Sequence, residues 1–270
     1  MTGPRLGLAL GCGSARGWAH IGVIRGLAEH GLEPHVVAGA SVGALVAAAY
    51  ASGRLDALES WVRTLTQREV WHLVDTSFRG GGVMTGNRLM DTIAARIGDP
   101  PIEELGRRFA AVATDLHTGE EVWIRTGPVM TAVRASSGVP GLFTPTWYLD
   151  RWLIDGGVVN PLPVSVCRAL GADIVIAVDL SRSVQQGDPA ALRSAQPSML
   201  EAMGNAVNIM QDAITRNRLV IDPADLVLHP VLDHFALMDF HRAVEAIELG
   251  RRHVQDHAEL LGPILARLRG

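Results

Sequence analysis

Short apolar runs alternate along this chain with longer segments in which apolar residues recur at helical spacing. The apolar runs that predict strands cover residues 6–11, 36–38, 109–114, 121–124 and 174–179. The segments that predict helices cover residues 17–30, 42–51, 55–66, 87–97 and 129–135. The run at 174–179 is apolar, as in a strand that is buried on both faces. This alternation predicts an α/β fold with three layers, α/β/α, in which a mostly parallel sheet has helices on both sides.

The last third of the chain has a different pattern. A hairpin is expected at residues 147–154, and the polar stretch at 181–197 predicts an exposed loop. Residues 199–219 predict a helix with a methionine-rich stripe, and residues 242–268 predict an amphipathic helix. The stripe favours packing on the domain or on a second subunit over an adaptable binding surface. We expect one domain over residues 1–270, with a core at about 5–180 and a helical part at 195–270 packed on it.

Charge and composition exclude several classes of function. The formal net charge is −4 and no run of basic residues occurs, so nucleic-acid binding and polybasic docking on anionic lipid lack support. The chain has no lysine, which excludes a Walker A loop, a Ser-Lys dyad and a Schiff-base lysine. Residues 36–53 are uncharged but contain three glycines, so a strand, a turn and a buried helix explain them better than a membrane span.

The two cysteines, Cys12 and Cys167, are far apart in the sequence, and no apolar leader segment precedes them. A disulfide framework is therefore not expected, and a reducing cytoplasm is the expected location, with the protein peripheral at the membrane at most. Neither cysteine has a partner at metal-ligand spacing, and the pair His253 and His257 lacks a third ligand. We expect no metal and no cofactor.

Two short motifs each follow an apolar run. Gly39-Ala40-Ser41-Val42-Gly43 has the form G-x-S-x-G between a predicted strand and a predicted helix. In that context the serine occupies a sharp turn with its hydroxyl exposed, as a nucleophile requires. Asp155-Gly156-Gly157 ends another apolar run, although Asp-Gly is also a common turn whose aspartate caps the backbone. Because ligands bind beyond the carboxyl ends of the strands in such sheets, Ser41 and Asp155 can meet at one edge.

A glycine-rich loop follows the first predicted strand. It comprises Gly11, Cys12, Gly13, Ser14, Ala15, Arg16 and Gly17. Glycines let the backbone approach a ligand, and a helix that starts here would direct free N–H groups to the same place. Such amides stabilise the oxyanion of an acyl-transfer reaction. The glycines also match the start of a dinucleotide fingerprint, but the acidic candidate Glu33 lies before a strand rather than at its end, which argues against NAD.

The order of these three motifs resembles the patatin-like phospholipase family. Weaker similarity to small bacterial members continues at residues 135–141 and 238–243, so the resemblance covers nearly the whole chain. It implies a FabD/lysophospholipase-like fold and a catalytic dyad, with Ser41 as nucleophile and Asp155 as proton acceptor. It also implies that the loop from Gly11 to Gly17 is the oxyanion hole. Cys12 departs from the family, which commonly has Gly or Ser there, but a small side chain should leave the loop path intact.

The residues alone leave the identity of the base open. A triad in the order Ser, Asp, His could use His229, His234 or His241, of which His229 is the best placed. The order of the motifs favours the dyad. His20 lies one turn into its helix and is expected to be structural. Arg16 is either a solvated residue at a helix start or the holder of a phosphate or carboxylate near the site.

The sequence therefore predicts a serine acyl-ester hydrolase whose substrate is a lipid acyl ester, a phospholipid or lysophospholipid. The alternatives are a small-ester hydrolase or thioesterase, and a non-catalytic regulatory protein on the same fold. Residues 78–84 are either a lid or an ordinary surface loop. We expect transient contact with a membrane surface, unless the apolar residues near the site are core residues. These residues are Phe78, Met84, Leu142, Phe143 and Trp147.

Overall fold

A computed structural model describes residues 3–75, 82–181, 196 and 199–269. Within this part of the chain, one mixed sheet has the strand order β10-β9-β1-β2-β4-β8-β7, and β5 is also paired with β4. Neighbours from β10 to β4 are parallel, whereas β5, β8 and β7 join antiparallel. The strands are β1 (Leu6–Leu10), β2 (Val36–Ala40), β4 (Arg108–Asp115), β5 (Glu121–Ile124), β7 (Thr146–Tyr148), β8 (Arg151–Asp155), β9 (Ile174–Val178) and β10 (Leu226–Leu228). The predicted α/β fold is confirmed.

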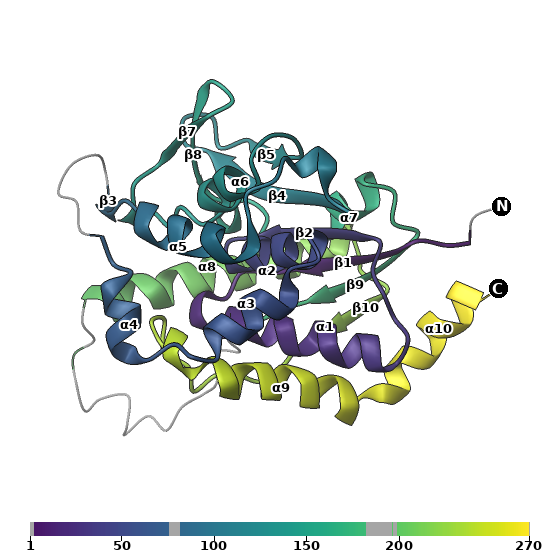
Figure 1. The fold of residues 1–270 in the computed structure, drawn as a ribbon. Coiled ribbons are helices and arrows are strands. Elements are labelled where there is room, and N and C mark those ends of the chain that lie inside the picture. Colours follow the sequence, from purple (N-terminus) through teal and green to yellow (C-terminus); the bar gives the residue numbers. More distant parts are fainter. Residues whose placement is uncertain (1–2, 76–81, 182–195, 197–198, 270) are drawn as a thin grey trace.

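Helices cover both faces of the sheet (Figure 1). One face packs mainly against α1 (Ala19–Glu29), α2 (Val42–Ala51), α3 (Leu55–Val62), α5 (Asn87–Ile97), α6 (Val129–Ser136) and α9 (Ala243–Asp256). The other face packs against α7 (Val164–Ala169), with the end of α8 (Met199–Ile221) beside it. None of the helices within the described residues is long and apolar enough to cross a membrane.

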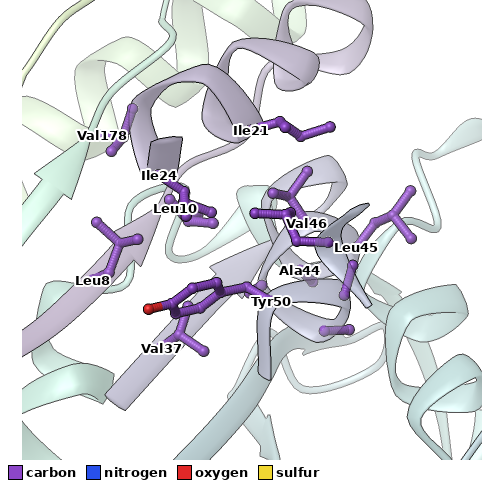
Figure 2. Packing of buried hydrophobic residues seen from close by; sticks show 14 of the residues in the cluster. Leu8, Leu10, Ile21, Ile24, Val37, Ala44, Leu45, Val46, Tyr50 and Val178 are labelled. Atoms are coloured by element: carbon purple, nitrogen blue, oxygen red, sulfur yellow. The ribbon is translucent and has the colours of Figure 1, made fainter. Parts of the chain in front are cut away.

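The core between the central strands and the first two helices consists of aliphatic side chains with little aromatic content. Figure 2 shows part of it, where side chains from β1 and β2 meet those of α1 and α2. The labelled residues are Leu8, Leu10, Ile21, Ile24, Val37, Ala44, Leu45, Val46, Tyr50 and Val178. The alanines of α2 keep that helix close to the sheet, and the serine that precedes it is therefore held close to the strand ends.

Several predicted boundaries differ from the structure. The segment 17–30 begins as a 3₁₀ turn, η1 (Ser14–Trp18), before α1 continues it. The segment 55–66 ends as α3 at Val62, because Thr66 and Glu69 form a capping box that starts α4 (Gln67–His72). The final segment is interrupted by a 3₁₀ turn, η6 (Ala258–Leu261), and resumes as α10 (Gly262–Arg269). The small parallel sheet of β3 (Gly82–Met84) and β6 (Gly141–Phe143) was not predicted.

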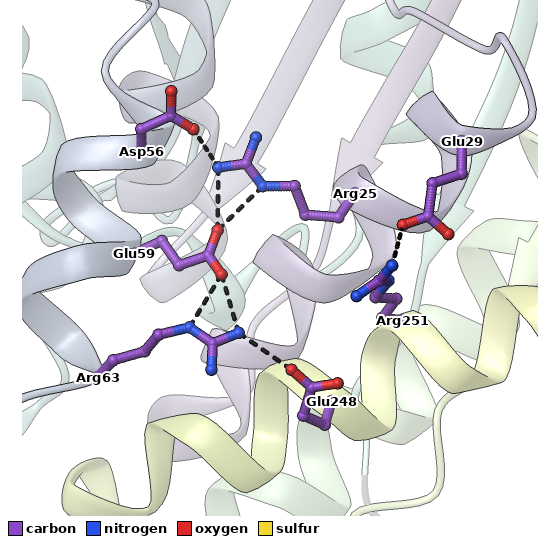
Figure 3. A network of polar contacts seen from close by, with 7 residues as sticks. All are labelled: Arg25, Glu29, Asp56, Glu59, Arg63, Glu248 and Arg251. Atoms are coloured by element: carbon purple, nitrogen blue, oxygen red, sulfur yellow. Dashed lines mark hydrogen bonds and ion pairs between the residues drawn. The ribbon is translucent and has the colours of Figure 1, made fainter.

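Charged residues join α1, α3 and α9 on the surface (Figure 3). Arg25 of α1 pairs with Asp56 and Glu59 of α3, and Arg63 links Glu59 to Glu248 of α9. Such exposed pairs contribute little individually, although a network of them contributes more. The network links α1, the helix that follows the glycine-rich loop, to α3 and α9.

Candidate active site

Ser41 sits in a strained turn between β2 and α2. Its φ of 57° and ψ of −129° lie in a region that non-glycine residues rarely adopt. The turn is possible because of the glycines on either side: a Cβ on Gly43 would lie 2.2 Å from the carbonyl oxygen of Leu10, and one on Gly39 would lie 2.4 Å from the Gly43 carbonyl carbon. The G-x-S-x-G motif therefore has the strand, turn and helix that the sequence predicted.

Ser136 fixes this turn from the side of α6. The amide of Ser41 donates to the Ser136 hydroxyl at 3.0 Å, and that hydroxyl donates to the carbonyl of Val112 at 2.5 Å. Ser136 is fully buried, so both bonds are shielded from water. In the sequence, Ser136 belongs only to a loop that resembles the family, and nothing there indicates this role, because it depends on contacts across the sheet.

Asp155 reaches Ser41 through the register of β4. Strand β5 pairs with one side of β4. On the other side, β2 pairs with β4 as far as Val112, and β8 pairs with it from Ala113 onward. Ala40, the last residue of β2, pairs with Val112, and Asp155, the last residue of β8, pairs with Ala113. The ends of these two strands therefore meet, and the residue after Ala40 is Ser41. The Thr114 hydroxyl also donates to the Asp155 carbonyl at 2.8 Å.

The Asp155 carboxyl group is almost fully buried, at 1% exposure. Its Oδ1 accepts a hydrogen bond from the Gly157 amide at 2.8 Å, and the Cys12 thiol lies 3.9 Å from the same oxygen. Within the described residues, Oδ2 has no partner with full hydrogen-bond geometry. Burial raises the pKa of Asp155 to about 6, and the Ser41 hydroxyl, which faces the carboxyl group, offsets part of that rise.

The glycine-rich loop is held in place by some of its own backbone groups. Gly11 donates its amide to the Val178 carbonyl and Cys12 donates its amide to the Pro161 carbonyl, each at 3.0 Å. Next come the amides of Gly13, Ser14 and Ala15, for which the described part of the chain provides no hydrogen-bond acceptor. These three amides precede or begin η1, beside Ser41.

An apolar cavity extends from Ser41 and this loop into the body of the protein. Its walls come from α2 to α5, from β3 and β6, from α8, and from the segment around residues 237–240. Its apolar lining includes Leu45, Leu65, Met90, Ile93, Leu142 and Phe143. Polar side chains are few in the lining and include Arg134, Asn208 and Gln211. A cavity of this kind suits a hydrocarbon chain that ends at the polar groups beside Ser41.

Comparison with known proteins gives the family. The family described as Patatin-like phospholipase matches residues 8–168 of this chain. An uncharacterized NTE family protein of Mycobacterium tuberculosis is 32% identical over 324 residues, covering 93% of this chain and 90% of the relative. The chain belongs to the patatin-like phospholipase family.

Two further relatives and one solved structure are similar over nearly the whole chain. A patatin-like phospholipase domain-containing protein of Caenorhabditis elegans is 30% identical, covering 94% of this chain and 20% of the relative. Lysophospholipase NTE1 of Pyricularia oryzae is 26% identical, covering 94% of this chain and 18% of that protein. The structure of VipD from Legionella pneumophila has a TM-score of 0.50 and 13% identity, covering 97% of this chain and 67% of that one, and shows likeness of fold.

The histidines of this patatin-like chain make contacts outside the cavity lining. No described residue that lines the cavity is a histidine. His229 faces Asp179, with 3.5 Å between Nδ1 and Oδ2, and His234 bonds Glu245 at 2.9 Å. His20 is fully buried, and its Nε2 lies 2.8 Å from the Gly11 carbonyl oxygen. Burial lowers the pKa of His20 to about 4, so its neutral ring donates to the loop.

Arg16 is buried rather than solvated. Its guanidinium donates to the Asn208 side chain of α8 at 2.7 Å and to the Gly13 carbonyl at 3.2 Å. It therefore joins the glycine-rich loop to α8. The methionine-rich stripe on α8 gave no sign of this contact, because Asn208 and Gln211 stand between the apolar positions on which that pattern depends.

The apolar residues expected near a membrane have different environments. Met84 is buried, and Leu142 and Phe143 are half-buried in the cavity wall. Trp147 is 56% exposed on β7. Phe78, and residues 78–81 of the segment considered as a lid, lie outside the described residues, whereas β3 forms its end. Among the described residues, no group of His, Cys, Asp and Glu side chains is arranged to hold a metal ion.

Proposed function

We propose that this protein is a serine acyl-ester hydrolase that acts on lipid acyl esters. The observation that carries the proposal is the position of the Ser41 hydroxyl, which faces the buried Asp155 carboxyl group at the wall of an apolar cavity. A serine in a strained turn beside a base is the arrangement that nucleophilic catalysis requires. Burial removes the Asp155 carboxylate from water and so costs free energy. A non-catalytic regulatory protein would not require such a group, whereas a catalytic base does.

The proposed reaction uses Asp155 first as base and then as acid. The Ser41 hydroxyl attacks the ester carbonyl carbon, and its proton passes to the Asp155 carboxylate. The tetrahedral intermediate collapses, and Asp155 returns the proton to the departing alcohol, which leaves the acyl group on Ser41. Water then attacks the acyl-enzyme and gives a proton to Asp155, which passes it to Ser41 as the carboxylic acid departs. A pKa of about 6 suits a group that must do both.

The oxyanion hole is proposed within the predicted loop Gly11–Gly17. The amides of Gly13, Ser14 and Ala15 are available as donors, while the two amides before them hold the loop on its neighbours. Donors that are fixed before the reaction need no reorganisation when charge develops on the carbonyl oxygen, and each contributes about 2.7–4 kcal/mol.

The substrate class follows from the cavity and from the family. An apolar cavity beside Ser41 favours a long acyl chain over a small ester or a thioester with a short acyl group. The similarity to a protein named Lysophospholipase NTE1 supports a lipid ester, from a phospholipid or a lysophospholipid. Both cysteines are free thiols, which is consistent with the proposed cytoplasmic location.

Hydrolysis of p-nitrophenyl esters by variants tests the dyad. Ser41→Ala and Asp155→Asn should each lower kcat by about a thousandfold or more, since members of one catalytic unit are not additive. His229→Ala, His234→Ala and His241→Ala serve as controls and should retain most of the activity, because none of these residues lines the cavity.

Two outcomes would contradict the proposal. A histidine variant that is as inactive as Ser41→Ala, with an unchanged melting temperature, would replace the dyad with a triad. Clear preference for acetate over medium and long acyl chains would contradict a lipid substrate.

A further inference from the structure

The side chain of Gln211 takes no part in the dyad, although it lies beside it. Gln211 is on α8 and lines the cavity, three residues after Asn208. Asn208 already accepts a hydrogen bond from Arg16. The Gln211 carboxamide, in contrast, makes no hydrogen bond within the described part of the chain, and its residue is only half-buried. An unpaired carboxamide at the wall of an apolar cavity is available to a ligand.

The position of Gln211 relative to the dyad can be read from Gly157. A Cβ on Gly157 would lie 2.3 Å from Gln211 Nε2, 2.6 Å from Cys12 Sγ and 3.0 Å from Asp155 Oδ1. The carboxamide, the thiol and the proposed catalytic carboxyl group therefore surround one point. Any larger residue at position 157 would fill that point, so Gly157 is what lets the carboxamide come close to Asp155.

This position lies on the alcohol side of the bound ester. In the proposed reaction, the proton on Asp155 must reach the oxygen of the departing alcohol, so that oxygen lies close to Asp155. The acyl chain would then extend along the apolar residues that α3, α5 and β6 contribute to the cavity wall. A group that is adjacent to Asp155 therefore meets the atoms next to the leaving oxygen, rather than the acyl chain.

We propose that Gln211 binds a free hydroxyl group of the departing alcohol. The substrate class is then an ester of a polyol in which a hydroxyl neighbours the ester oxygen. A carboxamide both donates to and accepts from a hydroxyl, so either orientation is satisfied. A site built for a hydroxyl discriminates against an ester without one, because its polar group then stays unpaired. This inference rests on the proposed hydrolase function.

A pair of esters with the same acyl chain tests the inference. Glyceryl monooctanoate has hydroxyl groups on its alcohol part, and propyl octanoate has none. Gln211→Leu keeps the volume of the side chain and removes its polar atoms. The quantity to compare is kcat/KM for the glyceryl ester divided by kcat/KM for the propyl ester. We expect this ratio to be about tenfold lower in Gln211→Leu than in the wild type, which is the effect of one hydrogen bond. Met210→Ala, at the exposed neighbouring residue on α8, is the matched control and should leave the ratio unchanged.

The outcomes separate this inference from the proposed function. An equal loss on both esters in Gln211→Leu would show a structural role for Gln211 and overturn the inference, as would a wild-type enzyme that does not distinguish the two esters. In both cases hydrolysis that depends on Ser41 would persist. If Ser41→Ala hydrolysed the esters as the wild type does, the proposed function itself would fail.

Discussion

At the scale of single residues, the burial of the Asp155 carboxyl group lowers the stability of the folded protein at neutral pH. Its carboxyl group is buried, and among the described residues it has hydrogen bonds but no ion pair. Desolvation raises its pKa to about 6, far above the ordinary value near 3.9. The carboxylate is therefore present at neutral pH but is less stable than in the unfolded chain, as is common where function and stability compete.

The pH dependence of stability and activity follows from this shift. Because the pKa of Asp155 is higher in the folded protein, its contribution to stability is greatest below about pH 4 and is lost as the pH rises through about 6. At about pH 7, Asp155→Asn should therefore raise the free energy of unfolding by up to roughly 3 kcal/mol. In the wild type, kcat/KM should fall below about pH 6, as the base is protonated.

Urea denaturation near pH 7 and near pH 4, together with a pH profile of kcat/KM, measures both effects. The two proteins should differ at neutral pH and converge at the lower pH. An Asn variant that is less stable than the wild type at neutral pH would contradict the account of Asp155.

The proposed catalytic residues lie in motifs that the sequence makes visible, whereas the residues that contact them from distant segments do not. Ser41 and Asp155 lie in short motifs whose glycines are required by local backbone geometry, so each motif is visible in the chain. Ser136 and Arg134 make their hydrogen bonds with residues far away in the sequence. Arg134, for example, donates to the carbonyls of Thr85 and Thr144 and so joins the ends of β3 and β6. Spacing in the sequence contains no record of such contacts.

At the scale of elements, α1 and α9 approach each other closely because glycines face the partner helix. A Cβ on Gly22 would lie 1.8 Å from the Ile247 carbonyl oxygen, and one on Gly250 would lie 2.2 Å from the Ala19 carbonyl oxygen. Backbone atoms cannot move aside as flexible side chains do. The position of α1, and with it that of the glycine-rich loop, therefore depends on these contacts.

Gly22→Ala should destabilise the protein by at least about 3 kcal/mol, because the helices must separate to admit one methyl group. The matched control is Gly262→Ala in α10, where a Cβ would meet no atom within 4 Å. That variant should change the free energy of unfolding by less than about 0.5 kcal/mol. Urea denaturation of both variants makes the comparison, and equal stabilities would contradict the role of the α1–α9 contact.

Element prediction succeeded where a pattern had clear ends. The helices predicted at 42–51 and 87–97 have these same bounds in the structure, because a glycine lies close to the end of each apolar segment. The final segment was expected as one helix, but α9 ends at Asp256. The chain breaks there at His257, although no proline or glycine occurs between Asp256 and Gly262 to mark the break in the sequence. Strand β10 has three residues, too few for a pattern.

At the scale of the whole molecule, the turn between β7 and β8 presents apolar side chains to solvent. Trp147 and Leu149 are 56% and 48% exposed, and Trp152 contacts Trp147 with 5.2 Å between ring centroids. Strand β8 leads from this hairpin to Asp155, and the hairpin projects beyond the end of β4, at the top of the view in Figure 1. Tryptophan side chains suit the interface of a bilayer.

We therefore expect the protein to bind vesicles of zwitterionic lipid through apolar burial, with little effect of salt. Trp147→Ala should weaken flotation with such vesicles by about tenfold. Val220→Ala, at an 83% exposed residue near the end of α8, is the control and should not change it. Binding that requires anionic lipid and disappears at high salt would show that charge is the driving force.

The central claim is that Ser41 is a nucleophile activated by Asp155, and labelling with a fluorophosphonate tests it most directly. We expect an adduct on the peptide that contains Ser41, located by mass spectrometry, with no adduct in Ser41→Ala and much slower labelling in Asp155→Asn. A wild-type protein that stays unlabelled, under conditions that label a known serine hydrolase, would contradict the claim.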